Sequence, residues 1–422
     1  MRRARLALRD DSGIAMMLVI GVMTVLFLTA TLLMVMVNYS TLSEKWQETR
    51  VKEIHLADAG INAYLYELRS DPLYYQTHPT LGPTSQDDGV WLVMASAPTS
   101  RTPLTLRAQG RLNSETASRT VVATVRFPTF ADYMFLSNAD LNVGGGATII
   151  GRVRTNGDLN NAGTITGASY AHGTITGAGT FGPSGNPIKK AGEPVLDFGG
   201  VLADMDSIRT AAQANSPQTY FAPSGYANGG YQIAFTGNGK QFTIRSVSAV
   251  SSNGSFTYGT VNLTRDIPPT GVIFVQDNVW VSGQYAAPCT IASSKNIYIP
   301  SSITRLDASA TYALGLISAQ SIVVPTQYDT ISSASTTTIT AALLAQSGSI
   351  YGNLVSGYRP QALHIYGSMA YNTYGYFASG NPATVGFQTR RYQYDAGLEN
   401  FPPPMFPQQK SGSLRLNTWV EG

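Results

Sequence analysis

The feature that most constrains this sequence is an uncharged, proline-free run of 24 residues from Ile14 to Val37. As an α-helix this run is about 36 Å long, which is enough to cross the roughly 30 Å hydrocarbon core of a bilayer. Its thirteen Leu, Ile, Val and Phe side chains favour insertion by about 4–8 kcal/mol. We therefore predict a transmembrane helix over residues 14–37.

The leader before this run, residues 1–13, is basic and contains Arg2, Arg3, Arg5 and Arg9. The positive-inside rule places the leader in the cytoplasm and the bulk of the chain on the other side of the membrane. A cleaved secretory signal is the alternative. Its apolar core spans only about 7–15 residues and precedes a small-x-small cleavage site, which does not follow this run. A retained single-pass anchor is the favoured interpretation.

Helical patterning continues over residues 38–71 as an amphipathic extension of the same helix. Apolar side chains recur there at i, i+3 and i+4 spacing, namely Ile54, Ala57, Ile61, Tyr64, Leu65 and Leu68. Gly60 weakens the helix by about 1 kcal/mol relative to alanine. The Asp71-Pro72 pair ends it, because a residue before proline avoids the helical conformation.

Beyond the helix the patterns are typical of β structure. Residues 72–128 contain three short segments with alternating apolar and polar side chains, which predicts a small antiparallel sheet packed on the exposed half of the helix. Residues 129–190 are punctuated by glycine, and the sequence Thr-Ile-Thr-Gly occurs at 164–167 and again at 174–177. Such repeats are typical of a β-solenoid, so we predict its first part here.

The repeat becomes clearer over residues 271–400, where a pattern of two short strands joined by a polar corner recurs. Its equivalent positions are Val279, Ile297, Ile322 and Ile350. Residues 191–270 interrupt the repeat and predict a short helix and a β-hairpin at the side of the solenoid. Residues 401–422 form a Pro-rich cap and a tail that adds a final strand. The low charged fraction, 13%, fits a stack of buried strands, and a β-sandwich is the competing interpretation.

The amino-terminal residues resemble those of prepilins. The basic leader, Asp11-Ser12-Gly13 and the following Ile14-Ala15-Met16-Met17-Leu18 look like a prepilin start, and His55-Leu56-Ala57-Asp58-Ala59-Gly60-Ile61 is similar to a segment of PilX-type minor pilins. The resemblance implies cleavage between Gly13 and Ile14 by a prepilin peptidase. It also implies a type IV pilus assembly protein with a pilin-like helix and a β-helical ectodomain.

One position departs from the pilin pattern. Pilins carry glutamate at the fifth mature position, where it pairs with a neighbouring subunit in the fibre, whereas this chain has Leu18. The departure disfavours a major, repeating subunit and favours a low-copy or tip subunit of a pilus or pseudopilus. The resemblance places the protein in the bacterial inner membrane and in surface fibres, with lipid, other pilin-like subunits and the assembly machinery as partners.

Few residues in the sequence point to catalysis. The acids Asp277, Asp307 and Asp329 are spread one per repeat, whereas glycan-cleaving or calcium sites need clustered carboxylates. Cys289 and the four histidines have no zinc-ligand spacing. We expect no catalytic, cofactor or metal site and no enzyme. The net charge of only +3 argues against a nucleic-acid partner.

One aromatic cluster stands out as a candidate binding patch for a surface glycan or protein. It contains Tyr371, Tyr374, Tyr376 and Phe377 in a Gly/Asn-rich stretch. Exposed rings stack on sugars or contact a partner, whereas rings packed on the solenoid wall only add to the core. The sequence leaves both alternatives open. A non-catalytic pilus-associated subunit is thus the favoured function, with a static surface adhesin or, less favoured, a β-helix polysaccharide enzyme as alternatives.

Overall fold

The structure, a computed structural model, describes residues 12–71, 74–97, 104–126, 128–182, 187–199, 201–214, 218–252, 254–327, 335–380, 383–409 and 415–421. The chain divides into two compact units. The helix–sheet unit comprises Met1–Ser96, Thr105–Thr124 and Thr418–Gly422, and the solenoid unit comprises Ala97–Leu104 and Val125–Asn417.

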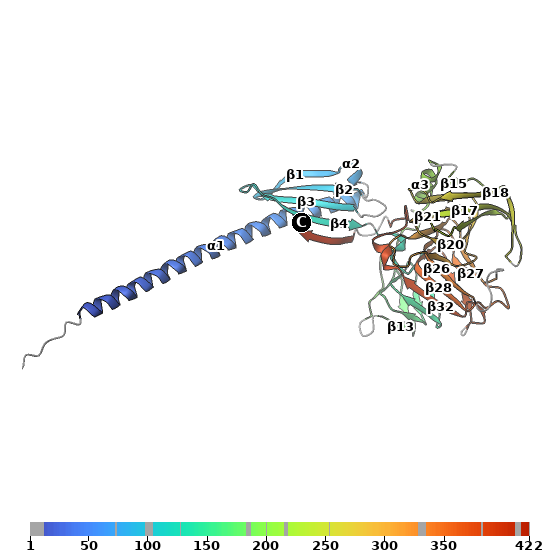
Figure 1. Cartoon of the computed structure of the whole chain (residues 1–422). Coiled ribbons are helices and arrows are strands. Elements are labelled where there is room, and N and C mark those ends of the chain that lie inside the picture. Colours follow the sequence, from blue (N-terminus) through green and yellow to red (C-terminus); the bar gives the residue numbers. More distant parts are fainter. Residues whose placement is uncertain are drawn as a thin grey trace, which may run out of the picture. The chain divides into compact units, whose positions relative to one another are not determined.

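The helix–sheet unit contains one long helix and a five-stranded sheet in the order β1-β2-β3-β4-β33 (Figure 1). Its elements are α1 Ser12–Ser70, α2 Tyr74–Thr77, β1 Thr80–Gln86, β2 Gly89–Ser96, β3 Leu104–Leu112, β4 Arg119–Arg126 and β33 Arg415–Glu421. The predicted tail strand therefore belongs to this sheet, beside β4. Two contacts tie it to α1: Trp419 donates to the Asp58 carboxylate at 2.7 Å, and Arg50 pairs with Glu421 at 2.7 Å.

The second half of α1 forms the core of this unit together with the sheet. Its buried apolar side chains are Leu56, Ala57, Ile61, Tyr64 and Leu68. Gly60 lies against the Trp91 ring, where a Cβ atom would come within 2.9 Å of the indole. Gly110 of β3 lies even closer to the helix, since a Cβ there would be 2.0 Å from the Glu53 carbonyl oxygen. The glycine that weakens the helix in isolation thus allows the sheet to approach it.

The solenoid unit is a stack of short parallel strands with three faces, and these parallel pairings exclude the β-sandwich. The helix face contains, in stacking order, β15 Tyr220–Phe221, β19 Val272–Val275, β21 Cys289–Ser293, β24 Leu314–Ser318, the second half of β26 Thr336–Ala345, the second half of β28 Ala362–Tyr371, β5 Phe135–Ser137, β8 Val153–Thr155, β11 Ser169–Ala171 and β14 Lys189–Lys190. The mainly β fold class with a long apolar helix, a small antiparallel sheet and a parallel solenoid is confirmed.

The other two faces follow the same order. The tyrosine face contains β16 Gly230–Phe235, β20 Asn278–Tyr285, β22 Ile297–Tyr298, β25 Ile322–Pro325, β27 Ile350–Asn353 and β29 Gly375–Tyr376, and then, as a separate sheet, β6 Leu141–Val143, β9 Leu159–Asn161 and β12 Ile175–Thr176. The third face contains the end of β20, β23 Ile303–Arg305, the first halves of β26 and β28, β32 Thr389–Tyr394, β7 Ala147–Ile150, β10 Thr164–Ile165 and β13 Thr180–Phe181.

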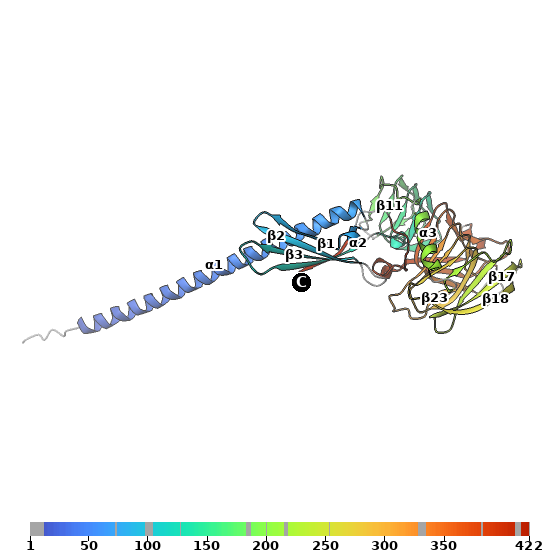
Figure 2. The same cartoon turned by 90° about the horizontal axis from the view of Figure 1, so that it is seen from above.

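The order of strands in the stack differs from their order in the sequence. The early strands β5 and β7 pair with the late strands β28 and β32, so that residues 135–150 continue the stack beyond residues 362–394. At the end of the stack away from β11, which is labelled in Figure 2, lie β15, which is labelled in Figure 1, and β16. The two parts of the solenoid predicted from the sequence therefore form one continuous core, closed by pairing between distant segments.

The interruption at 191–270 is only partly a side insertion. Helix α3, Val201–Gln213, packs Met205, Ile208 and Ala212 against the helix face. Strand β16 pairs antiparallel with β17 Gln241–Val250, which pairs with β18 Phe256–Asp266, as the predicted hairpin requires. However, β15 and β16 also pair in parallel with β19 and β20, so they extend the stack itself.

Short elements and prolines complete the unit. They are η1 Phe130–Asp132, η2 Ala396–Glu399, and the small antiparallel pair β30 Ala378–Ser379 and β31 Val385–Gly386. Pro403 and Pro404 are buried against the helix face, where the Pro404 carbonyl accepts a 2.5 Å hydrogen bond from Thr290 of β21. The proline run therefore lies along the solenoid and satisfies a buried hydroxyl.

Candidate functional site

The first half of α1 is an apolar surface that no other described part of the protein covers. Every side chain from Met16 to Glu48 is exposed, including Leu26 at 62% and Phe27 at 70%. Among the described residues, this helix is the one long and apolar enough to cross a membrane. Gly13 and Ile14 lie in its first turn. Cleavage between them stays a prediction.

The aromatic patch predicted from the sequence separates into two pairs. Tyr374 and Tyr376 are 49% and 40% exposed, whereas Tyr371 and Phe377 are buried in the solenoid core at 1% and 3%. The expectation of a single four-residue patch is therefore corrected. Successive strand residues point to opposite sides, and Tyr371 ends β28 with its side chain inward, packed edge-on against Phe135.

The exposed pair is completed by Tyr351, which sequence reasoning missed. The ring centroids of Tyr351 and Tyr376 are 5.6 Å apart and those of Tyr374 and Tyr376 are 5.2 Å apart, and both pairs are stacked. Tyr351 and Tyr376 occupy the same register position on neighbouring strands β27 and β29. We call Tyr351, Tyr374 and Tyr376 the tyrosine cluster. The repeat in the sequence contained a signal for Tyr351: it directly follows Ile350, which points inward, so alternation along the strand turns Tyr351 outward.

The same outward register continues toward the other end of the tyrosine face. Trp280, Tyr298 and Val323 occupy it on β20, β22 and β25, and the rings of Trp280 and Tyr298 stack at 5.0 Å. Burial raises the pKa values of Tyr298, Tyr351 and Tyr376, so their phenols are neutral at physiological pH. The outward row is therefore apolar and uncharged, with phenolic hydroxyls.

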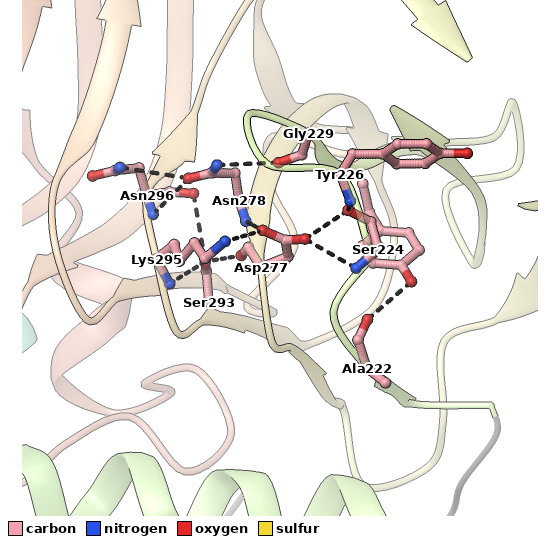
Figure 3. Close-up of polar contacts among 10 residues, drawn as sticks. Ala222, Ser224, Tyr226, Gly229, Asp277, Asn278, Ser293, Lys295 and Asn296 are labelled. Atoms are coloured by element: carbon pink, nitrogen blue, oxygen red, sulfur yellow. Dashed lines mark hydrogen bonds and ion pairs between the residues drawn. The ribbon is translucent and has the colours of Figure 1, made fainter. Parts of the chain in front are cut away.

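Asp277, one of the three acids considered for catalysis, is a structural carboxylate at the start of the tyrosine face (Figure 3). It is 1% exposed, and its oxygens accept from Lys295 Nζ at 2.8 Å, Ser224 Oγ at 2.7 Å, and the backbone N–H groups of Ser224 and Asn278. Burial alone would raise the pKa of Asp277, but these hydrogen bonds outweigh burial and hold it below its usual value. The carboxylate joins the loop at residue 224 to adjacent rungs of the stack.

Replacing this carboxylate tests its structural role. We expect Asp277→Asn to destabilise the protein by about 1–3 kcal/mol at pH 7, because either orientation of the amide places a donor against a backbone N–H, that of Ser224 or that of Asn278. The folded-state pKa of Asp277 is lowered, so its stabilisation is complete above the unfolded-state value of about 4 and is lost as the pH falls below it. Urea unfolding at pH 7 and pH 3 should show the difference between wild type and variant shrinking with acidity. A constant difference at both pH values would contradict the assignment.

The remaining acids do not assemble into a site. The Asp307 carboxylate is exposed and accepts from Ser309, Asp206 on α3 pairs with Arg209, and Asp329 lies outside the described residues. Within the described ranges, no group of three or more His, Cys, Asp or Glu side chains could hold a metal ion.

The nucleophile and base candidates are separate as well. Cys289 is fully buried, and burial raises the pKa of its thiol to about 12, so it is a neutral core residue. His364 is exposed on the third face, in register with Thr338 and Arg391. The geometry thus offers an apolar helix surface and an aromatic row, and it shows no nucleophile–base pair among these candidates.

Comparison with known proteins gives only distant structural similarities. No protein-family model and no curated protein matches the sequence. A similar solved structure is the competence-associated pilin ComZ from Thermus thermophilus, at 14% identity, with 89% of this chain and 97% of that chain covered and a TM-score of 0.35. An ice-binding protein from the Antarctic ascomycete Antarctomyces psychrotrophicus covers 63% of this chain and 96% of its own at 12% identity and a TM-score of 0.23. These low scores and identities assign neither a family nor a function.

Proposed function

We propose that this protein is a non-catalytic, membrane-anchored, pilin-like subunit that takes part in type IV pilus or pseudopilus assembly. The observation that carries the proposal is the division of α1 into two halves. The first half is apolar and exposed over its whole circumference, and the second half is packed on a sheet. A helix that is apolar all round needs an apolar environment on every side.

Two environments suit such a helix, and assembly exchanges one for the other. In the bilayer the segment from residue 14 to 37 is surrounded by lipid, with the basic leader in the cytoplasm. In a fibre the same surface packs against helices of neighbouring pilin-like subunits and stays dry. Thr24, Thr29 and Thr31 do not oppose either state, because each hydroxyl donates to a carbonyl of its own helix.

The size of the solenoid unit favours a low-copy or tip position. This unit spans most of the chain from Val125 to Asn417, and such a bulk on every subunit would crowd a thin fibre. Leu18, where pilins have glutamate, agrees with this position. The partners in this proposal are membrane lipid, other pilin-like subunits, the assembly machinery and a prepilin peptidase.

A static surface adhesin is the second candidate, and the exposed rings of Tyr374 and Tyr376 in the tyrosine cluster are the observation that favours it. The less favoured polysaccharide enzyme has no such support, because Asp277 is saturated by hydrogen bonds and Asp307 stands apart from it.

Amino-terminal sequencing of protein from sheared surface fibres and from membranes tests the proposal. We expect the fibre form to begin at Ile14 and Gly13→Val to keep the intact leader and to be missing from fibres. Gly21→Val is the matched control, because Gly21 has open space around it within the same helix, and this variant should be cut and assembled normally. A wild-type chain that retains Met1 and occurs only in membranes would exclude assembly and favour the static adhesin.

A further inference from the structure

The tyrosine face is interrupted at one place, where the late and early parts of the solenoid meet. On the other two faces the ladder continues across this junction through β28–β5 and β32–β7. On the tyrosine face the described strands β29 and β6 belong to separate sheets. A pocket of about 270 Å³ lies there, lined from one side by Tyr376 and Phe377 and from the other by residues 141–147. We call it the seam pocket.

Arg390 lines this pocket and occupies a register position at which the two adjoining strands carry apolar residues. In the register of the third face it stands between Leu363 of β28, which is fully buried, and Ala147 of β7. Its neighbour Arg391 is exposed, as expected for the alternate side of the strand. Arg390 itself is half-buried, so its charged end is not enclosed by the core and stays within reach of a ligand in the pocket.

The Arg390 guanidinium has hydrogen-bonding capacity left for a ligand. It donates to the Phe387 carbonyl at 2.9 Å, and no carboxylate among the described residues lies within ion-pair distance of it. The residues lining the pocket include no acid. Gly146 leaves the guanidinium uncovered, because a Cβ at that position would lie 3.1 Å from Nη2. The pocket therefore combines one available cation with an opening formed by glycines.

We propose that the seam pocket binds an acidic sugar residue of a polysaccharide, with its carboxylate on Arg390. Guanidinium groups bind carboxylates through paired, charge-assisted hydrogen bonds. The volume lies just below the usual range of about 300–1,000 Å³ for ligand pockets, which suits one sugar ring. Asn142 offers a side-chain amide for hydroxyl groups, and Tyr376 offers an aromatic wall.

The tyrosine cluster extends the site along the solenoid. Tyr376 belongs both to the pocket and to the cluster, so sugars that follow the acidic residue reach Tyr374 and Tyr351. The strands β20, β22, β25, β27 and β29 contain no charged residue. A nucleic acid needs cations along its phosphates, so this uncharged surface favours a glycan with a carboxylate at one position.

Calorimetric titration of the full chain in detergent micelles tests the site, with sialyllactose, a trisaccharide that carries one carboxylate on its terminal sugar, as the acidic probe and galactotriose as the neutral one. We expect the wild type to prefer the acidic trisaccharide at least tenfold. Arg390→Leu should remove this preference while folding normally, because leucine matches Leu363 in the register. Arg391→Leu is the matched control and should bind like the wild type.

Two further variants separate the pocket from the cluster. Gly146→Val should weaken binding at least tenfold by covering the guanidinium, and Tyr376→Ala about fivefold, whereas Tyr66→Ala on exposed α1 should change nothing. Equal affinity for both trisaccharides, equal binding by Arg390→Leu, or tighter binding of tri-aspartate or oligo-dT would overturn the proposal. None of these results bears on the assembly role of α1, so the two proposals fail separately.

Discussion

Replacing both Leu26 and Leu28 by arginine should release the protein from the membrane. Both leucines are exposed near the centre of the uncharged segment, at 62% and 55%. Each replacement shifts the free energy of insertion by about 3–4 kcal/mol, so the pair costs about 6–8 kcal/mol, which matches the whole favourable sum of the segment. The double variant should therefore appear in the soluble fraction or be degraded, while the wild type stays in the membrane.

Extraction of membranes with alkaline carbonate measures this effect. The matched control is the double variant Val51→Arg/Tyr66→Arg, whose exposed apolar side chains, at 50% and 68%, lie on the same helix beyond residue 37. It should resist extraction like the wild type. If the Leu26/Leu28 variant also resists extraction, the uncharged segment is not the anchor.

Removing the Asp395 carboxylate should lower the free energy of unfolding of the solenoid unit more than removing an exposed charge does. Asp395 pairs with Arg305, and their side chains are 6% and 8% exposed. Asp395 also accepts from the Gly397 N–H at 2.9 Å, and Arg305 donates to the Ala310 carbonyl at 2.7 Å. Asp395→Ala leaves a buried, unpaired guanidinium, so we expect a loss of about 3–5 kcal/mol in the free energy of unfolding.

Urea unfolding followed by circular dichroism tests this value. The double variant Arg305→Leu/Asp395→Leu should recover most of the loss, because it leaves no charge behind. The control is Asp206→Ala, which breaks the exposed pair with Arg209 on α3 and should cost less than about 1 kcal/mol. Equal losses for the buried and the exposed pair would show that burial does not govern the interaction.

The local parts of this fold were predictable because their signals are local. The apolar segment and its amphipathic continuation indicate α1 by spacing alone. The recurring two-strand pattern also predicted the correct register between repeats. Its equivalent positions are paired in one ladder of the tyrosine face, namely Val279, Ile297, Ile322 and Ile350. Likewise Leu141 pairs with Leu159, 18 residues later.

The non-local parts were not predictable in the same way. The two Thr-Ile-Thr-Gly segments lie on different faces, because Ile165 pairs with Ile149 whereas Ile175 pairs with Leu159. Nothing in the residues near Phe135 indicates that they pair with Met369. The seam pocket arises from this long-range closure, so Arg390 could not be singled out from its sequence context. The sequence identified Tyr374 and Tyr376 of the tyrosine cluster but not Tyr351. The segment from 371 to 377 is too short and irregular for alternation to show which of its rings point outward.

The position of β33 beside β4 has a mechanical consequence. The chain leaves the helix–sheet unit after β4, forms the solenoid unit, and returns as β33 to the same sheet. A pull on the solenoid segment Val125–Asn417 is therefore transmitted at its two ends into the neighbouring strands β4 and β33. Both strands are drawn in the same direction from their adjoining ends, so tension does not slide one past the other. The load passes instead to the ladder between β4 and β3 and to the Trp419 and Glu421 contacts with α1.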